Sequence, residues 1–233
     1  HPDPSGPALW IGHENSISRF NGQSFDHYYI RAILDRTNGD SVRCFVGDGT
    51  DGFWFAGGEN IFANQAFGLA HFDGAHFEVY SSAEGIPNSV VWELMLDSQD
   101  RLWCATNFGV CFREGGQFHW LTTEDGLPSV QARAILEDRN GTIWVGTMGG
   151  LCTFDEATRT FSPSTPSAHR PIVAMTEDQR GDLWLGFGGG WNEAGEGVGR
   201  WDGETLRFYT EADGLADNRV LGIFEASDGR MWF

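Results

Sequence analysis

Short apolar runs alternate with polar turns along this chain, and the stretch 137–155 shows the pattern clearly. Residues 132–136 (ARAIL) are apolar apart from Arg133, Asp138–Gly141 is a polar turn, and residues 142–147 (TIWVGT) form a second run. Asn-Gly between two β-prone runs is a strong hairpin signal. A third run, Leu151–Phe154, follows a pair of glycines. The pattern therefore predicts a small antiparallel meander.

The meander recurs along the whole chain. An apolar residue followed by Trp appears at Trp steps of 44, 49, 41, 40 and 48 residues, at Trp10, Trp54, Trp103, Trp144, Trp184 and Trp232. A polar turn precedes each of the last five, and a Gly-containing run, an aromatic run and a loop commonly follow. A period of about 44 residues is typical of propeller blades. We predict an all-β propeller of about five four-stranded antiparallel blades.

The repeat boundaries predict one propeller domain over residues 9–233, preceded by a leader-like or tag-like segment, residues 1–8. Four periods are complete, at residues 41–80, 89–121, 130–163 and 170–210. The first period starts at its second strand, Leu9–Gly12, and the last holds a first strand, Arg219–Phe224, and the start of a second. We expect the N- and C-terminal strands to pair and close the ring, which would hide both sheet edges. The alternative is a segment of a longer array.

Two periods carry insertions after the second strand, at residues 58–67 and 187–197. In a four-stranded blade this loop lies on the same face as the loop that leads to the next blade. Insertions gathered on one face of a repeat protein usually mark its binding face. We therefore expect a ligand on the loop-rich face and a structural role for the short Asp-containing turns.

Charge and apolar content exclude two classes of partner. The net charge is −18 and the sequence pI is near 4.5. A chain this acidic repels nucleic acid, so we predict no nucleic-acid partner. The sequence has no apolar run long enough for a transmembrane helix, so we predict no membrane insertion of this chain.

The cysteines do not show a metal-binding spacing. Cys44, Cys104, Cys111 and Cys152 form no CxxC pair, and the preferred interpretation is four buried free thiols. Cys104 and Cys111 could also face each other across one hairpin. Neither HExxH nor GxSxG occurs, so we predict no metal, no cofactor and no catalytic residue.

Candidate ligand-binding residues follow from aligning the first strands on the Trp. Arg43, Arg133 and Arg219 lie near the start of this strand, with Gln131 beside them. Since arginine binds carboxylates in bidentate fashion, their convergence on one channel mouth would make a pocket for an anionic ligand. The alternative is that each arginine pairs with a local carboxylate such as Glu93.

Aromatic residues are expected near the same face. Trp92, Phe62 and Trp191 are candidates for stacking on sugar rings, with Asn192 beside Trp191. The alternative is that these aromatic side chains pack beneath their own loops. The candidate ligand-binding set is therefore Arg43, Trp92, Gln131, Arg133, Arg219, Phe62, Trp191 and Asn192.

The repeat resembles a known family. The motif D-x-x-G-x-[LI]-W-[VIL]-G-T followed by GL-x-x-F-D, F-x-x-Y and DGLP is similar to the two-component regulator propeller repeat, and residues 138–155 and 123–130 match it well. The resemblance implies a β-propeller of the periplasmic or extracellular sensor part of bacterial hybrid histidine kinases, many of which respond to glycans. Such propellers usually have seven blades, so the alternative of a fragment of a larger ring stays open.

Three function classes follow. The first is a non-catalytic ligand-binding or sensor propeller that recognises an oligosaccharide or another small anionic or polar ligand. The second is a propeller enzyme that resembles streptogramin lyase or a glycan-active lyase or hydrolase. The third is a structural or assembly propeller, for which self-association is expected.

Overall fold

The computed structural model describes residues 9–13, 16–20, 22–29, 42–50, 52–57, 68–80, 85–86, 90–164, 169–188 and 195–233. Nearly all regular structure in these ranges is β-strand, and the strands within them pair in antiparallel fashion. The all-β prediction is confirmed. Across the described parts of the chain, no helix is long and apolar enough to cross a bilayer.

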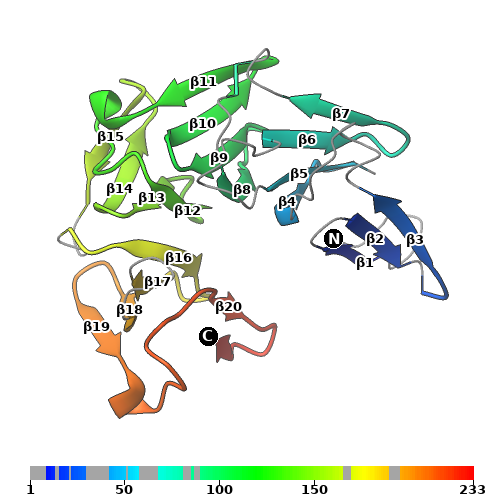
Figure 1. Ribbon diagram of the computed structural model, residues 1–233. Coiled ribbons are helices and arrows are strands. Elements are labelled where there is room, and N and C mark those ends of the chain that lie inside the picture. Colours follow the sequence, from blue (N-terminus) through cyan, green and yellow to red (C-terminus); the bar gives the residue numbers. More distant parts are fainter. Residues whose placement is uncertain are drawn as a thin grey trace. The chain divides into compact units, whose positions relative to one another are not determined.

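Four four-stranded sheets correspond to the four complete repeats (Figure 1). The first two blades consist of β4 (Val42–Gly47), β5 (Phe53–Gly57), β6 (Gly68–Phe72) and β7 (Phe77–Tyr80), then β8 (Val91–Leu96), β9 (Leu102–Thr106), β10 (Gly109–Glu114) and β11 (Gln117–Leu121). The next two consist of β12 (Ala132–Glu137), β13 (Ile143–Thr147), β14 (Gly150–Asp155) and β15 (Thr160–Pro163), then β16 (Ile172–Glu177), β17 (Leu183–Gly188), β18 (Gly195–Trp201) and β19 (Leu206–Tyr209). The predicted strand order and blade boundaries are confirmed.

Two smaller sheets contain the strands at the ends of the described chain. One holds β1 (Leu9–Gly12), β2 (Ser16–Phe20) and β3 (Phe25–Tyr29), and the other holds β20 (Phe224–Glu225) and β21 (Met231–Trp232). The first strand predicted over Arg219–Phe224 is wrong for most of its length, because only Phe224 and Glu225 find partners in β21. Ring closure by pairing of the terminal strands stays a prediction.

The insertion predicted at 187–197 is also shorter than expected. Strands β17 and β18 continue the ladder to Gly188, which stands opposite Gly195. Strand pairing therefore takes up both ends of the segment. The other predicted insertion, 58–67, lies outside the described residues.

The described chain forms two compact units. Unit 1 comprises residues 1–107 and 111–119, and unit 2 comprises residues 108–110 and 120–233. In unit 1, Ile17, Phe53, Phe55, Ala70 and Phe72 form a buried cluster. In unit 2, a larger cluster joins the first three strands of one blade to the first two strands of the next, at Ala134, Trp144, Leu151, Ile172, Met175, Leu183, Leu185 and Phe187. Burial of these apolar faces is the main stabilising contribution within each unit.

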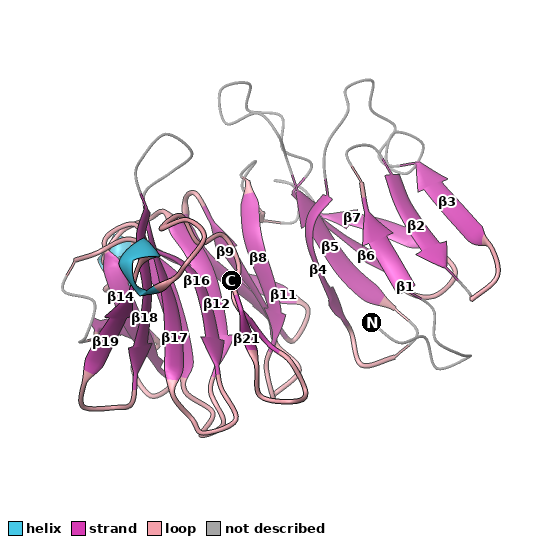
Figure 2. Ribbon diagram, turned by 90° about the horizontal axis from the view of Figure 1, so that it is seen from below, coloured by secondary structure: helices cyan, strands magenta, loops and turns pink. Residues whose placement is uncertain are grey.

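The short turns between first and second strands are held by an aspartate. Asp178 Oδ1 accepts hydrogen bonds from the backbone N–H groups of Arg180 and Asp182, and Oδ2 accepts one from Trp184 Nε1 at 2.9 Å. The carboxylate therefore caps its own turn and fixes the Trp of the following strand. In Figure 2 these turns are the pink connections at the ends of the magenta strands. The expected structural role of the turns is confirmed for Asp97, Asp138 and Asp178.

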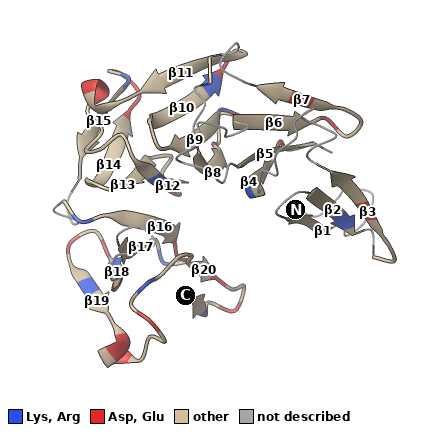
Figure 3. Cartoon of the chain, viewed as in Figure 1, with Lys and Arg blue, Asp and Glu red and all other residues tan. Residues whose placement is uncertain are grey.

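The blade-to-blade loops of unit 2 contain short 3-10 helices, η2 (Thr123–Asp125) and η3 (Glu211–Asp213). Each ends in a glycine with positive φ, and the acidic residues of η3 are visible in red after β19 in Figure 3. Gly126 has a φ of 94°, and a Cβ there would lie 2.1 Å from the Phe161 carbonyl oxygen. Only glycine satisfies both conditions without a shift of the backbone. The Asp-Gly of the TEDGLP motif is thus explained by turn geometry.

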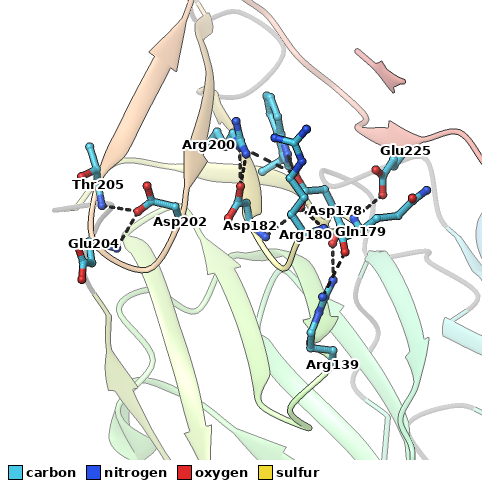
Figure 4. Close-up of polar contacts among 11 residues, drawn as sticks. Arg139, Asp178, Gln179, Arg180, Asp182, Arg200, Asp202, Glu204, Thr205 and Glu225 are labelled. Carbon is cyan, nitrogen blue, oxygen red and sulfur yellow. Dashed lines mark hydrogen bonds and ion pairs between the residues drawn. The ribbon is translucent and has the colours of Figure 1, made fainter. Parts of the chain in front are cut away.

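Adjacent blades of unit 2 are also joined through their turns (Figure 4). Arg139 reaches the next blade, where Nε donates to Glu177 Oε1 at 2.6 Å and the guanidinium donates to the carbonyl oxygens of Asp178 and Gln179. One blade further, the backbone N–H of Gln179 donates to Glu225 Oε2 at 2.8 Å. In this unit the turn of one blade is therefore hydrogen-bonded to the next blade at both boundaries.

Candidate functional site

A β-bulge occurs at the same position of the inner strand in all four complete blades. The pairing register shifts between Val42 and Cys44, between Val91 and Glu93, between Ala132 and Ala134, and between Ile172 and Ala174. The skipped residues are Arg43, Trp92, Arg133 and Val173, which we call the bulge row. A bulge leaves its extra residue out of the ladder and re-aims its side chain, and bulges are common beside active sites. Three of the predicted ligand-binding residues belong to this row.

The sequence carries a signal for this bulge that strand alternation alone does not reveal. Residues twelve positions before the Trp are apolar, and so are those nine positions before it; Ile172 and Met175 are one such pair, and both are buried. Positions three apart face opposite sides of a regular strand. The two apolar side chains can therefore be buried in the same core only if the strand holds an extra residue between them.

Arg43 and Trp92 lie against each other in unit 1. The guanidinium carbon of Arg43 lies 4.7 Å from the centre of the Trp92 ring, a cation–π contact between β4 and β8. Trp92 Nε1 donates to Asn107 Oδ1 at 2.6 Å. Asn107 is held in turn by its backbone N–H, which donates to the Val90 carbonyl oxygen. Arg43, Trp92 and Asn107 form what we call the stacked site; β4 shows its basic position in blue in Figure 3.

The electrostatics around the stacked site are mixed. Cys44 follows Arg43 and is half-buried, so its thiol is partly desolvated. This desolvation raises the pKa of Cys44 well above its usual value. Cys104 and Glu93 raise the pKa further, whereas Arg43 lowers it. Arg43 and Glu93 therefore act on the Cys44 thiol with opposite sign.

In unit 2 the corresponding residues form a separate pair. Arg133 Nη2 donates to Gln131 Oε1 at 3.3 Å. Gln131 is exposed, and its backbone bonds to Ser129 Oγ and to the N–H of Met148 hold the start of β12. Arg219 lies outside any strand, where its backbone N–H donates to Asp217 Oδ1. Two of the candidate residues, Gln131 and Arg133, are thus hydrogen-bonded to each other.

The other predicted site residues are not brought together by the described structure. Phe62, Trp191 and Asn192 lie outside the described residues. Arg43 belongs to unit 1, whereas Arg133 and Arg219 belong to unit 2, so the convergence of the three on one mouth stays a prediction. Sequence reasoning missed Asn107, because its role depends on its position opposite the bulged Trp92, which strand spacing alone does not specify.

Three of the described histidines of unit 1, His13, His27 and His71, have local structural partners. His71 Nε2 lies 2.7 Å from Asp48 Oδ2, and its ring stacks on Trp54. In this blade the imidazole replaces the indole N–H that binds the turn aspartate elsewhere. His13 and His27 both hydrogen-bond to Ser18 Oγ. Within the described ranges, no group of three or more His, Cys, Asp or Glu is arranged to hold a metal.

Comparison with known proteins identifies the repeat. The family model described as two component regulator propeller matches residues 126–149 and 214–233. The first match contains the Asp138–Trp144 turn, and the second contains β20 and β21. A comparison with curated protein sequences found no match.

Several solved structures share the fold. One is the extracellular domain described as belonging to a hybrid two-component system of B. thetaiotaomicron, 20% identical with a TM-score of 0.74, covering 99% of this chain and 31% of that one. Virginiamycin B lyase from Staphylococcus aureus is 16% identical with a TM-score of 0.71, covering 97% and 73%. PorZ, a surface component of the type-IX secretion system of Porphyromonas gingivalis, is 12% identical with a TM-score of 0.69, covering 99% and 37%.

This chain spans about a third of the length of the B. thetaiotaomicron extracellular domains described as parts of one- or two-component systems. The sequence match and the fold agree, since the first matched segment contains β12 and β13 of one blade and the solved structures share the fold. The chain therefore carries the repeat of the two-component regulator propeller family.

Proposed function

We propose that this chain is a non-catalytic, ligand-binding propeller of the sensor type. Its ligand is an oligosaccharide or another small anionic or polar molecule, bound at the stacked site of unit 1. The observation that supports this proposal is the stacked site, where two successive bulges present Arg43 against Trp92.

The chemistry of the stacked site suits an acidic sugar. An indole ring packs against the apolar face of a pyranose, and a guanidinium binds a carboxylate through two parallel hydrogen bonds. The bond from Trp92 to Asn107 limits rotation of the indole, so less side-chain entropy is lost on binding. A uronic acid residue would use both groups together.

The relatives support a location outside the cytoplasm. Two of them are extracellular domains of B. thetaiotaomicron proteins described as one- or two-component systems. By analogy, we place this chain in the periplasm or outside the cell, as part of a sensor whose signal would pass to segments beyond it.

Calorimetric titration with matched neutral and uronic-acid oligosaccharides tests the proposal. We expect Arg43→Ala to weaken binding of the acidic sugar by about tenfold, or about 1.4 kcal/mol, and to leave the neutral sugar almost unchanged. Trp92→Ala should weaken both. Arg207→Ala is the matched control, because Arg207 makes a similar contact with Tyr209, at 4.9 Å, away from the bulge row. Unchanged sugar binding in both Arg43→Ala and Trp92→Ala would reject the stacked site as the ligand-binding site.

The enzyme alternative is favoured by one comparison. Virginiamycin B lyase shares the fold, and a histidine-to-alanine variant of it is described as catalytically inactive and was solved with quinupristin. We expect this chain to leave quinupristin intact, as followed by mass spectrometry. Enzyme-dependent conversion of the compound would establish the lyase class instead.

The assembly alternative concerns self-association. Among the described strands, the first and last sheets contain three and two strands instead of four, and unpaired sheet edges favour strand addition. Light scattering across a concentration series distinguishes the classes: a monomer supports the sensor proposal, whereas a defined oligomer supports an assembly role.

A further inference from the structure

The blade formed by β8 to β11 contains two cysteines on adjacent strands. Cys104 lies in β9 and Cys111 in β10, which neighbour each other in the sheet. Both belong to unit 1, both are free thiols, and each is about 1% exposed. The Cys111 thiol is near enough to raise the pKa of Cys104. No step of the proposed function uses this pair.

The hairpin fixes the pairing of the two cysteines. Strand β9 ends at Thr106 and β10 begins at Gly109, so two residues form the loop. The next blade has the same arrangement between Thr147 and Gly150, with Val145 directly opposite Cys152. Because loop length sets hairpin register, the equivalent residues Cys104 and Cys111 stand directly opposite each other.

This register suits a disulfide. Opposed residues of antiparallel strands have Cα atoms about 4.5 to 5.5 Å apart. A disulfide requires about 4.4 to 6.8 Å. The Cα separation expected for Cys104 and Cys111 therefore lies within the range that a disulfide spans.

We propose that Cys104 and Cys111 form a cross-strand disulfide when the chain folds in an oxidising compartment. The oxidant is a small-molecule or protein disulfide. One cysteine thiolate attacks it to give a mixed disulfide and releases one thiol; the second cysteine then attacks the bonded sulfur and releases the other thiol. Two cysteine thiols are oxidised, one disulfide is reduced to two thiols, and the two protons pass to those thiols.

The bond would brace the hairpin that carries Asn107, the residue that holds Trp92. It would form during folding, because the thiols are buried once the blade is complete. Burial and the neighbouring thiol also keep Cys104 protonated in the folded reduced chain: the Cys111 hydrogen bond and desolvation raise the pKa of Cys104. The folded reduced protein should therefore react with glutathione disulfide much more slowly than the refolding chain.

Peptide mapping after refolding in a glutathione redox buffer tests this inference. The chain is denatured without reduction, alkylated and digested with trypsin, which releases Leu102–Arg113 with both cysteines in one peptide. We expect this peptide to carry no alkyl group and to be two hydrogen atoms lighter than the reduced peptide.

Two controls make the result specific. Cys152 faces Val145 and should be alkylated throughout. In the variant Cys104→Ser, Cys111 should become alkylated or carry glutathione. The proposal would be overturned if the peptide Leu102–Arg113 carried two alkyl groups after oxidative refolding while the circular dichroism spectrum of the refolded protein was native. A bond from either cysteine to Cys44 or Cys152 would overturn it as well.

Discussion

Trp144 Nε1 donates a hydrogen bond to Asp138 Oδ2 at 2.9 Å, across six residues and from one strand back to the turn before it. The same bond joins Asp97 to Trp103 and Asp178 to Trp184. The last repeat has Ala226 where the aspartate would stand, and its Trp232 is 59% exposed. Its turn still forms through backbone bonds between Ala226 and Arg230 and between Gly229 and Ala226. The aspartate therefore links the turn to the core and is not needed for the turn itself.

Asp97→Ala should be strongly destabilising. Asp97 accepts from Arg101 Nε at 2.6 Å and from Trp103 Nε1 at 2.7 Å, and all three side chains are almost fully buried. The substitution removes the nearer of two carboxylates beside the buried guanidinium, since Glu114 Oε1 lies 3.9 Å away, and breaking a buried ion pair typically costs about 3–5 kcal/mol. Urea unfolding measures the change. Asp73→Ala is the control, since Asp73 caps an exposed turn, and its effect should stay at about 1 kcal/mol.

Acid should destabilise the fold through the turn aspartates. Burial raises the pKa of Asp97 and Asp178, but hydrogen bonds from the Trp indoles and the turn backbone outweigh it and lower the pKa below its usual value. An unfolded aspartate has a pKa of about 3.9, so below this pH the unfolded chain binds more protons. The contribution of both residues is fully present above about pH 5 and is lost as the pH falls through the folded pKa values. Unfolding free energies measured from about pH 7 to about pH 3 should show this decline. The decline should be shallower in Asp97→Asn; an equal slope would contradict the assignment.

Arg139→Ala should weaken the junction between two blades of unit 2. The guanidinium bonds Glu177 and two carbonyl oxygens of the next turn, but the side chain is nearly half exposed. We expect a loss of about 1 kcal/mol, reduced at high salt. Arg159→Ala serves as the control, because Arg159 lies 3.9 Å from exposed Glu156 and should change stability by less than about 0.5 kcal/mol. Thermal melts at two salt concentrations measure both effects.

Two glycines with similar φ should respond differently to alanine. Gly126 has a φ of 94° and Gly141 a φ of 82°, so both substitutions carry backbone strain of about 1 kcal/mol. Only at Gly126 would the added methyl group also meet a backbone oxygen, that of Phe161 at 2.1 Å. Gly126→Ala should therefore lower the melting temperature clearly more than Gly141→Ala. Equal losses would show that the backbone near Phe161 relaxes without penalty.

The sequence by itself determined the repeat, the strand order within blades and the strands at each blade boundary. These features rest on local chemistry: Asn-Gly and Asp-Gly turns, apolar alternation and one Trp in each period. The same reasoning overextended the strand at Arg219–Phe224, because it treated β-propensity as sufficient where a partner strand was needed.

The tertiary structure decided which candidate residues meet. Arg43 stacks on Trp92 because β4 and β8 carry a bulge at equivalent positions. Asn107, from the hairpin of β9 and β10, hydrogen-bonds to Trp92. Contacts of this kind depend on packing between strands about 50 residues apart in the sequence. The residue pattern within one strand therefore does not predict them. Sequence thus set the blades through local turn and strand preferences, whereas long-range packing selected the stacked site.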